Sequence, residues 1–284
     1  MPFSSSDYVE LRCQSAFTFL EAASNPEDLA DRAAELGYPA VALGDVGGIY
    51  GIPRFHRAAS DAGLRAIVGA QIFVADPNAP APLLLLVETQ RGYANLCRIL
   101  TESHRHVAKG ESLNRWEEIE ECAEGLTALA RGDASLRTSV LDRANAIFGR
   151  DRLWVDVSRH LDRATEAAGR RAVALAEAAR VPVVATNDVC HARPEGRQLF
   201  DALTCLRWKT SLDRAGRHLA VNAERHLRSP REMAEWFVGR PAWIRATREV
   251  SERCAFGLEN LGYRFPLYPV PIGETQASYL RHLT

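Results

Sequence analysis

Short apolar runs alternate along the chain with longer segments whose apolar residues recur at helical spacing. A short apolar run bounded by turn residues is typical of a buried strand, and apolar positions three and four apart are typical of a helix packed on a sheet. The predicted strands cover residues 9–11, 40–43, 66–74, 83–87, 126–130, 153–157 and 182–185. Helices are predicted between most of them, at 26–36, 53–62, 90–106, 133–148 and 162–180. The alternation predicts an α/β fold built on a parallel sheet or barrel.

Two of the predicted helices carry clear start signals. Asn25 is a suitable N-cap, Pro26 fits the first helical position, and Gly37 is suited to end the same helix. The segment 229–232, Ser-Pro-Arg-Glu, has the spacing of a capping box with proline at the first helical position. These signals fix the expected starts of helices at residues 26 and 230.

The pattern changes after Thr186, where helical segments follow one another without strands between them. They are predicted at 194–207, 229–238 and 241–255. We therefore divide the chain into a barrel at 1–192 and a helical annex at 193–284. The annex is expected to pack on the barrel or on absent downstream domains through Leu199, Phe200, Leu203, Leu206, Trp236 and Phe237. Residues 276–284 have the pattern of a helix cut short, which indicates a piece of a longer protein.

The composition is that of an ordinary globular chain. It has 284 residues, of which 46% are hydrophobic and 25% charged, and a formal net charge of −1. The longest aliphatic run, 83–87, is far too short to span a bilayer. No basic and apolar leader opens the sequence, so the cytoplasm is the expected location and no membrane partner is expected. The six cysteines form no Cys-x-x-Cys pair, which argues against a zinc ribbon or a thioredoxin-type redox site.

The charge is unevenly distributed. Residues 193–231 contain nine Lys or Arg against four Asp or Glu, a local charge of +5. Such a segment can contact phosphates, with Trp208 available for stacking on a base. The alternative is a solvated helix face or a surface that docks on an acidic neighbour. The candidate nucleic-acid or docking surface is Arg207, Trp208, Lys209, Arg214 and Arg217.

Reactive groups of a parallel barrel lie at the carboxyl ends of its strands. Reading those ends gives Arg12, Cys13, Gln14, Ser15, Asp45, Gln71, Arg131, Asp133, Asp188, Cys190 and His191. A hydrolytic metal site needs several carboxylates and imidazoles together. Only Asp45, Asp188 and His191 suit that role, with Cys190 as a soft additional ligand. The alternative is that these residues cap strand ends through hydrogen bonds.

Several segments together resemble a known family. They are VELRCQSAFTFLEAASNPEDLADRAAELGYPAVALGD, AGLRAIVGAQIFV, RGYANLCRIL, VPVVATNDVCHARPEGRQLFDALTCLR and NAERHLRSPREMAEWF. In order and spacing they are similar to a PHP (polymerase and histidinol phosphatase) domain. The version resembled stands at the amino terminus of the alpha-type subunit of bacterial DNA polymerase III, in its error-prone, damage-inducible branch. The resemblance covers nearly the whole chain.

The resemblance implies a distorted seven-stranded (β/α) barrel with a metal cluster at the strand ends. In this chain most of the family's ligand positions are replaced. The His-x-His after the first strand falls on Arg12 and Gln14, and the Asp-His after the second falls on Asp45 and Val46. The glutamate of the third strand is Gln71, and the histidine opening the fourth is Pro82. The final Asp-x-His falls on Asp188 and Cys190, with His191 one residue off the pattern.

The resemblance therefore implies a metal-free, degenerate PHP domain without catalytic activity or a cofactor of its own. Its role would be structural and docking, within a DNA polymerase for translesion synthesis and DNA repair. The parent would carry out Mg-dependent nucleotidyl transfer during replication past DNA damage. The implied partners are the downstream polymerase core, DNA through the parent, the sliding clamp and other lesion-bypass proteins.

Two rival functions stay open. The first is a metal-dependent phosphoesterase or 3′–5′ exonuclease with a remodelled site at Asp45, Asp188, Cys190 and His191. The second is a free-standing nucleic-acid-binding module that uses residues 193–231.

The loss of the imidazoles leaves Asp45 and Asp188 facing one site, where like-charge repulsion is unfavourable. Arg12 stands at a former ligand position, and its guanidinium carries five donors. We therefore predict that Arg12 fills the former metal site and bonds Asp45, Asp188 or both.

Overall fold

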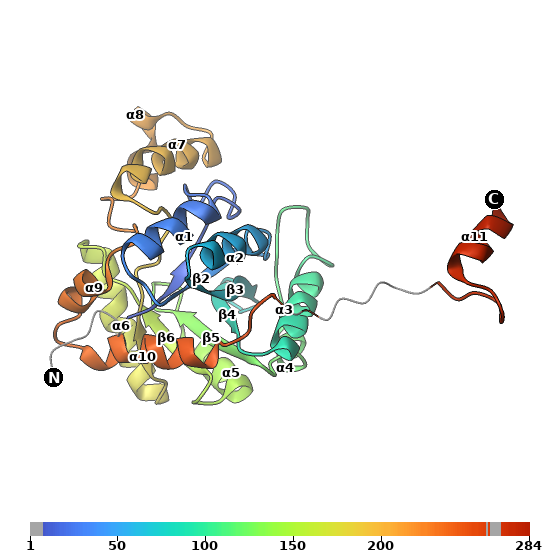
Figure 1. Cartoon of the computed structure of the whole chain (residues 1–284). Coiled ribbons are helices and arrows are strands. Elements are labelled where there is room, and N and C mark those ends of the chain that lie inside the picture. Colours follow the sequence, from blue (N-terminus) through green and yellow to red (C-terminus); the bar gives the residue numbers. More distant parts are fainter. Residues whose placement is uncertain (1–7, 260, 262–267) are drawn as a thin grey trace.

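The computed structural model describes residues 8–259, 261 and 268–284. Seven strands form one curled sheet in the order in which they occur along the chain. They are β1 (Glu10–Cys13), β2 (Ala40–Val46), β3 (Arg65–Val74), β4 (Ala81–Val87), β5 (Leu126–Arg131), β6 (Leu153–Val157) and β7 (Val183–Ala185). Helices lie around the outside of the curled sheet (Figure 1). The fold is α/β, a distorted seven-stranded barrel followed by helices, as the sequence predicts.

The helices around the sheet are α1 (Pro26–Glu35), α2 (Ile52–Asp61), α3 (Gln90–Ser103), α4 (Trp116–Glu120), α5 (Thr138–Phe148) and α6 (Arg163–Ala179). Those that follow β7 are α7 (Arg197–Arg207), α8 (Leu212–Ala215), α9 (Pro230–Trp236), α10 (Pro241–Arg253) and α11 (Gln276–Leu283). Both predicted start signals are confirmed. The Asn25 amide donates to Asp28 at 2.9 Å, and the Ser229 amide donates to Glu232 at 2.8 Å.

One strand runs against the expectation of a parallel sheet. β4 is antiparallel to both β3 and β5, whereas the other neighbouring strands are parallel. The segment between β3 and β4 is too short for the helix that a parallel crossover requires, so the chain folds back as a hairpin. The alternation of strands and helices is therefore interrupted at this point.

The two ends of the sheet meet at a narrow seam. Beyond β7, Val189 forms a parallel bridge with Cys13 of β1. The Gln14 amide donates to the Val189 carbonyl at 2.8 Å, and the Val189 amide donates to the Arg12 carbonyl at 2.9 Å. The barrel is thus closed at the carboxyl end of its strands, where a catalytic site would lie.

The barrel interior is packed by large side chains set against glycines. A Cβ atom on Gly44 would lie 2.4 Å from Leu84 Cδ1, and one on Gly69 would lie 2.7 Å from Leu86 Cδ2. The leucines of β4 therefore occupy the space that side chains on β2 and β3 would need. The glycines of β2 and β3 and the leucines of β4 thus fit together and fill this part of the barrel interior.

Helix α10 closes the amino-terminal end of the barrel. Ala246 and Val250 of this helix, and Cys254 directly after it, belong to the same buried cluster as the interior side chains. The Val9 amide donates to Thr247 Oγ1 at 2.9 Å, and Arg65 donates to the Cys254 carbonyl at 2.7 Å. A helix of the predicted annex thus completes the core of the barrel, and the division at residue 192 stays a prediction.

The remaining annex positions differ in burial. Phe200 and Phe237 are buried, Leu203 and Trp236 are partly buried, and Leu199 and Leu206 are exposed. Phe237 and Trp236 pack with the main core, whereas Phe200 packs with Cys190 and Ala22. In the described part of the chain, no helix combines the length and apolarity needed to cross a membrane.

Candidate functional site

The carboxyl ends of β5, β6 and β7 surround a cavity of about 310 Å³ at the barrel mouth. Its lining combines cations and carboxylates. They are Arg131, Asp133, Asp156, His160, Asp188 and Arg225. Arg12 of β1 lies below this cavity, since it contacts Asp156 directly. The mouth is therefore the candidate site, and its chemistry depends on how these charges pair.

Arg12 is buried inside the barrel, with 1% of its surface exposed. Its Nε and Nη2 donate to the two carboxylate oxygens of Asp156 at 2.7 and 2.9 Å. Nη1 donates to Gln71 Oε1 at 2.6 Å. Thr186 Oγ1 donates to Asp156 at 3.1 Å, so the Asp156 carboxylate is held both by Arg12 of β1 and by the residue that follows β7. A bidentate pair of this kind is among the stronger and more directional interactions available to a buried arginine.

A β-bulge directs Arg12 inward. The four residues Glu10–Cys13 of β1 lie opposite only three residues of β2, Val41–Leu43, so β1 contains one extra residue. Leu11 belongs to the interior cluster, yet its neighbour Arg12 also reaches interior partners. A bulge breaks the strict alternation of side chains and turns one of them to the other face. The bulge is therefore what lets an arginine enter the interior at this strand end.

The predicted partners of Arg12 were wrong. Its carboxylate partner is Asp156 on β6, not Asp45 or Asp188. The sequence carried a signal for this residue, because Asp156 is a lone charge inside the apolar strand β6. A carboxylate at such a position needs a buried cation. Asp156 precedes the last residue of its strand, so it is not among the residues that follow strand ends.

Asp45 is held by the loop after β1. It accepts hydrogen bonds from the Ser15 amide at 2.6 Å, Ser15 Oγ at 2.8 Å and Thr18 Oγ1 at 3.0 Å. Burial raises the pKa of Asp45 and these hydrogen bonds oppose the shift. Its carboxylate is thus taken up in fixing a loop, as the capping alternative predicts.

Asp188 is held by two arginines. Arg131 donates to its Oδ2, and Arg225 Nη2 lies 2.9 Å from the same oxygen. Burial raises the pKa of Asp188, but the positive charges of Arg131, Arg225 and Arg12 outweigh it and keep the pKa well below the usual range. Its Oδ1 is buried and has no hydrogen-bond partner in the described part of the chain. Asp188 therefore stays ionised as the anchor of the two arginines.

The other predicted ligand positions do not converge on the mouth. The backbone amide of Gln14 takes part in the seam. The backbone amide of Val46 donates to Thr18 Oγ1 at 3.1 Å, and Pro82 pairs with Phe73 in the sheet. Burial raises the pKa of Cys190 to about 11, so its thiol stays protonated. These positions therefore add no ligand at the mouth.

The two histidines nearest the site act as neutral hydrogen-bonding groups. His191 contacts the Arg193 carbonyl at 2.9 Å, and burial lowers its pKa to about 4. His160, which the sequence analysis missed, contacts the Asn187 carbonyl at 3.0 Å, and burial lowers its pKa as well. His160 lies three residues after the end of β6, so its position soon after a strand was the available signal.

The residues at the mouth do not fit a metal cluster. Within residues 8–259, 261 and 268–284, no group of three or more His, Cys, Asp or Glu side chains is placed to hold a metal ion. Three aspartates, Asp133, Asp156 and Asp188, are matched instead by Arg131, Arg12 and Arg225. Arginine charge therefore lies among the three aspartates, and a guanidinium repels a divalent cation.

The family follows from comparison with known proteins. A model described as "PHP domain" matches residues 10–176. The chain belongs to the PHP domain family.

This PHP domain is also similar to longer proteins. It is 42% identical over 283 residues to an error-prone DNA polymerase of Anaeromyxobacter dehalogenans, a match that covers 93% of this chain and 24% of the relative. The error-prone DNA polymerase of Alkalilimnicola ehrlichii is 38% identical, with 98% of this chain and 27% of the relative covered. The chain thus spans about a quarter of the length of these curated relatives. The resemblance to the PHP domain of an error-prone polymerase is confirmed.

Among solved structures, the chain is similar to an amidohydrolase from Chromobacterium violaceum determined with bound sulfate and no metal. The TM-score is 0.44 and the identity 13%, covering 64% of this chain and 87% of that one.

The predicted nucleic-acid or docking surface is one exposed segment of the PHP domain. Arg207 and Trp208 end α7, Lys209 follows, and Arg214 and Arg217 belong to the short helical turns after it. The Trp208 and His218 rings stack with centroids 4.3 Å apart. Arg207 forms an ion pair with Glu21 at 2.8 Å. The structure brings these side chains together, and their role stays a prediction.

Replacing Arg12 by alanine should destabilise the domain by about 3–5 kcal/mol, because Asp156 would be left buried and unpaired. Arg98→Ala is the control, since Arg98 and Glu121 form an exposed pair at 3.2 Å, and it should change little. The double variant Arg12→Met, Asp156→Leu should lose less than Arg12→Ala, because no charge is orphaned. Urea unfolding measures all three. A loss below about 1 kcal/mol for Arg12→Ala would contradict the role assigned to the pair.

Glu10 should make stability depend on pH. It is buried, and burial raises its pKa from an ordinary value of 4.5 to about 7, although Tyr8, the Arg12 amide and the Asn187 amide donate to it. The folded state then holds a proton that the unfolded state releases, so this contribution is present below pH 4.5 and is lost as pH rises to 7. The loss should be about 3 kcal/mol and absent in Glu10→Gln. Urea unfolding at several pH values compares the two proteins, and parallel curves would contradict the assignment.

Proposed function

We propose that this chain is a PHP domain that works without a metal cluster, as the structural amino-terminal module of an error-prone DNA polymerase. The observation that carries the proposal is the buried Arg12–Asp156 pair, with its bidentate contacts at 2.7 and 2.9 Å. It fills the interior below the barrel mouth with a protein cation. The similarity to error-prone polymerases over 93–98% of this chain supports the placement in such a protein.

The proposal extends to the whole polymerase. Its activity would be template-directed nucleotidyl transfer during translesion synthesis, DNA repair and replication after DNA damage, in the cytoplasm. Mg ions would act in the polymerase core and not in this domain. The partners would be that core, DNA, the sliding clamp and other lesion-bypass proteins.

A surface of α7 supports a docking role. Leu199, Ala202, Leu203 and Leu206 recur at the spacing of one helix face, and Leu199 and Leu206 are 53% and 65% exposed. We call these four residues the α7 stripe. The relatives contain about three quarters of their length outside the matched segment, which supplies enough protein to cover the stripe. We propose the polymerase core as the occupant, because an exposed apolar stripe of this kind is typical of a contact surface.

The metal-free proposal predicts a metal content well below one ion per chain after gel filtration, measured by elemental analysis of the 284-residue protein. Added Mn²⁺ should produce no release of nitrophenol from p-nitrophenyl phosphate and no shortening of a 3′-labelled oligonucleotide. EDTA should leave the melting temperature unchanged, because no metal contributes to folding. Two or more ions per chain, or Mn²⁺-dependent cleavage, would favour the phosphoesterase or exonuclease rival.

The docking proposal predicts an effect only in a longer protein. A chimera is suitable, in which this chain replaces the matching segment of the Anaeromyxobacter dehalogenans relative. Leu199→Asp with Leu206→Asp should lower its melting temperature and its polymerase activity, because charges would be placed in an apolar contact. The control is Val238→Asp, at a residue 75% exposed and outside the stripe. A chimera with unchanged melting temperature and activity would show that the core does not cover the stripe. Strongly salt-dependent DNA binding by the 284-residue chain, lost in Arg214→Ala, would favour the nucleic-acid module instead.

A further inference from the structure

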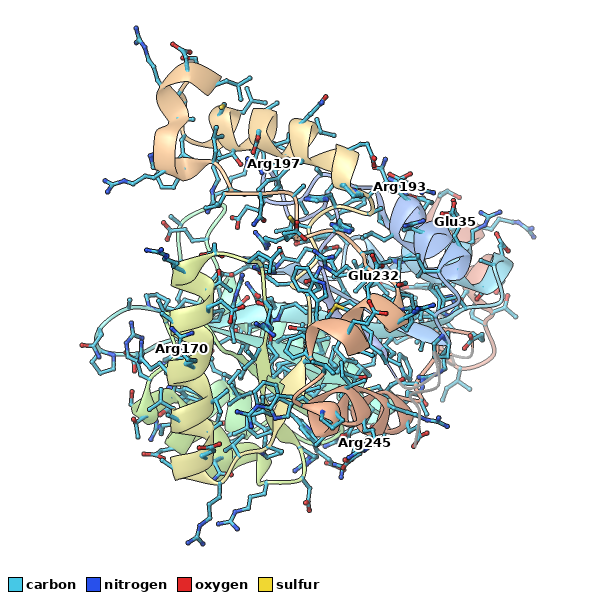
Figure 2. The ribbon with its side chains drawn as sticks, turned by 90° about the vertical axis from the view of Figure 1, so that its left-hand side faces the viewer. Glu35, Arg170, Arg193, Arg197, Glu232 and Arg245 are labelled. Carbon is cyan, nitrogen blue, oxygen red and sulfur yellow. The ribbon has the colours of Figure 1, made fainter. Side chains whose placement is uncertain are left out.

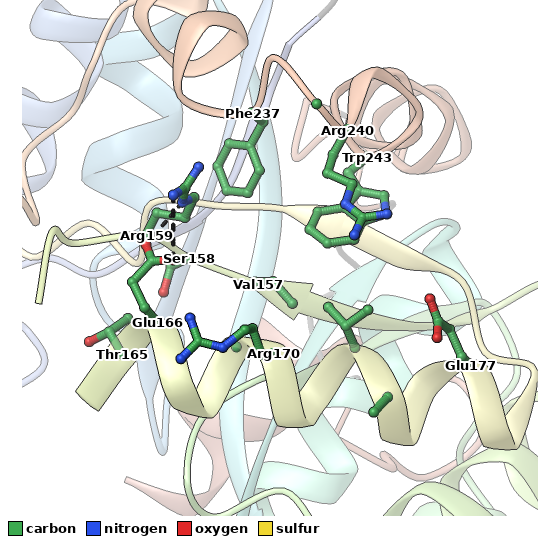
Figure 3. A pocket seen from close by; sticks show the side chains of 14 residues that line it. Val157, Ser158, Arg159, Thr165, Glu166, Arg170, Glu177, Phe237, Arg240 and Trp243 are labelled. Carbon is green, nitrogen blue, oxygen red and sulfur yellow. Dashed lines mark hydrogen bonds and ion pairs between the residues drawn. The ribbon is translucent and has the colours of Figure 1, made fainter. Parts of the chain in front are cut away.

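A second cavity, of about 430 Å³, lies on the outer side of the barrel. It is bounded by the end of β6, one face of α6, and the corner where α9 leads into α10 (Figure 3). Its volume is within the range of small-molecule sites. Ser158 and Thr165 line both this cavity and the one at the barrel mouth, but none of the aspartates of the mouth lines it.

The middle of this outer cavity is apolar and aromatic. Val157 lies on one side, and Phe237 and Trp243 lie on the other (Figure 3). Val173 of α6 also lines the cavity. The two aromatic rings are tilted by 59° with centroids 6.2 Å apart. α6 can approach β6 closely here because residue 169 is glycine, where a Cβ atom would lie 3.3 Å from Val157 Cγ1. The result is a slot with one aromatic wall and one aliphatic wall, which suits a flat ring.

One end of the slot is positive. Arg159 is fixed by Glu166 at 2.9 Å and by the Trp236 carbonyl at 2.7 Å. Arg170 lies on the same side of the slot (Figure 3), and it has no hydrogen bond or ion pair within the described part of the chain. An arginine without a carboxylate partner beside a cavity is available for a phosphate.

The other end of the slot carries a carboxylate. Glu177 stands there, near Trp243 and Arg240 (Figure 3). Arg240 lies over the Trp243 ring at 5.0 Å and holds it in place by a cation–π contact. Among the described residues, no side chain bonds the Glu177 carboxylate. The slot therefore offers the guanidinium of Arg170 at one end, beside the Arg159–Glu166 pair. At the other end it offers the Glu177 carboxylate as a hydrogen-bond acceptor, with Arg240 engaged on the Trp243 ring.

We propose that this slot binds a purine nucleoside 5′-phosphate, either free or as an unpaired nucleotide of a single strand. The phosphate contacts Arg170 beside Arg159, and the base lies against Trp243, which is backed by the buried Phe237. Arg170 and Glu177 are seven residues apart on one face of α6, about 10 Å along the helix axis, which is the length of a purine nucleotide. Guanine fits best, because its base edge presents adjacent N–H donors that a carboxylate accepts.

An acidic peptide suits the slot less well. Its carboxylates would pair with Arg170, but the same charge would be repelled by Glu177 at the far end. A nucleotide reverses polarity along its length, with an anionic phosphate and a donor-bearing base, and so matches both ends.

Calorimetric titration of the 284-residue chain with dGMP tests the proposal, with deoxyguanosine, dTMP and the single-stranded heptamer TTTGTTT as further probes. Gly239→Leu should block the slot, since a Cβ atom at Gly239 meets no atom within 4 Å and the fold can accept it. Arg170→Ala removes the phosphate contact. Arg245→Ala is the matched control, because Arg245 is an exposed arginine of α10 that does not line the slot (Figure 2).

We expect Arg170→Ala and Gly239→Leu each to weaken dGMP binding roughly ten-fold or more, with Arg245→Ala unchanged. Deoxyguanosine should bind correspondingly less well than dGMP, and Glu177→Gln should reduce the preference for dGMP over dTMP. Binding of the heptamer as well as dGMP identifies a strand as the source, and dGMP alone identifies a free nucleotide.

Several results would overturn the proposal. The first is the absence of saturable binding of both dGMP and the heptamer. The second is binding that is undiminished in Gly239→Leu although its melting curve is unchanged. The third is that dGMP and the heptamer do not displace each other while the peptide Asp-Asp-Phe binds tightly. The metal content of the domain has no bearing on these outcomes, so they are read independently of the function proposed above.

Discussion

The buried pair of Arg12 and Asp156 is the interaction on which the interior of this barrel depends. Both side chains are almost fully buried, at 1% and 3% exposure, and each satisfies the other with two hydrogen bonds. Gln71 and Thr186 complete the arrangement from β3 and the end of β7. Removing one charge would leave the other in a medium that solvates it poorly, so the two residues are constrained together. A barrel that has this pair at its centre carries a cation of its own beside Asp156.

The surrounding charges follow from the same constraint. Asp188 stays ionised inside the fold because Arg131 and Arg225 lie beside it. Arg225 comes from the segment that follows α8, so this contact also ties the annex to the mouth of the barrel. At the opposite end, α10 supplies apolar side chains to the interior cluster. The annex therefore holds the barrel at both ends, in addition to any contact that it makes with another domain.

Much of the fold could be predicted from the sequence, and parts of the site could not. Apolar runs located all seven strands, and Asn25 and Ser229 marked helix starts that the structure confirms. The direction of β4 was missed because periodicity carries no information on strand polarity. That Arg12 would enter the interior was expected, but its partner was not. The bulge in β1 changes which residues face inward, and such an irregularity leaves no trace in an alternating pattern.

The seam has a consequence for how the chain reaches its folded state. β1 and the segment after β7 share a single bridge, which side-chain contacts supplement. Arg12 and Asp156 are 144 residues apart in the sequence, and Glu10 and Asn187 are 177 residues apart. On a ribosome, β1 and its neighbour β2 emerge close together, but the groups that close the seam emerge much later. Closing so large a loop is slow, because its entropy is lost before the contacts form. The seam, and not the pairing of β1 with β2, is therefore expected to be among the last parts of the barrel to form.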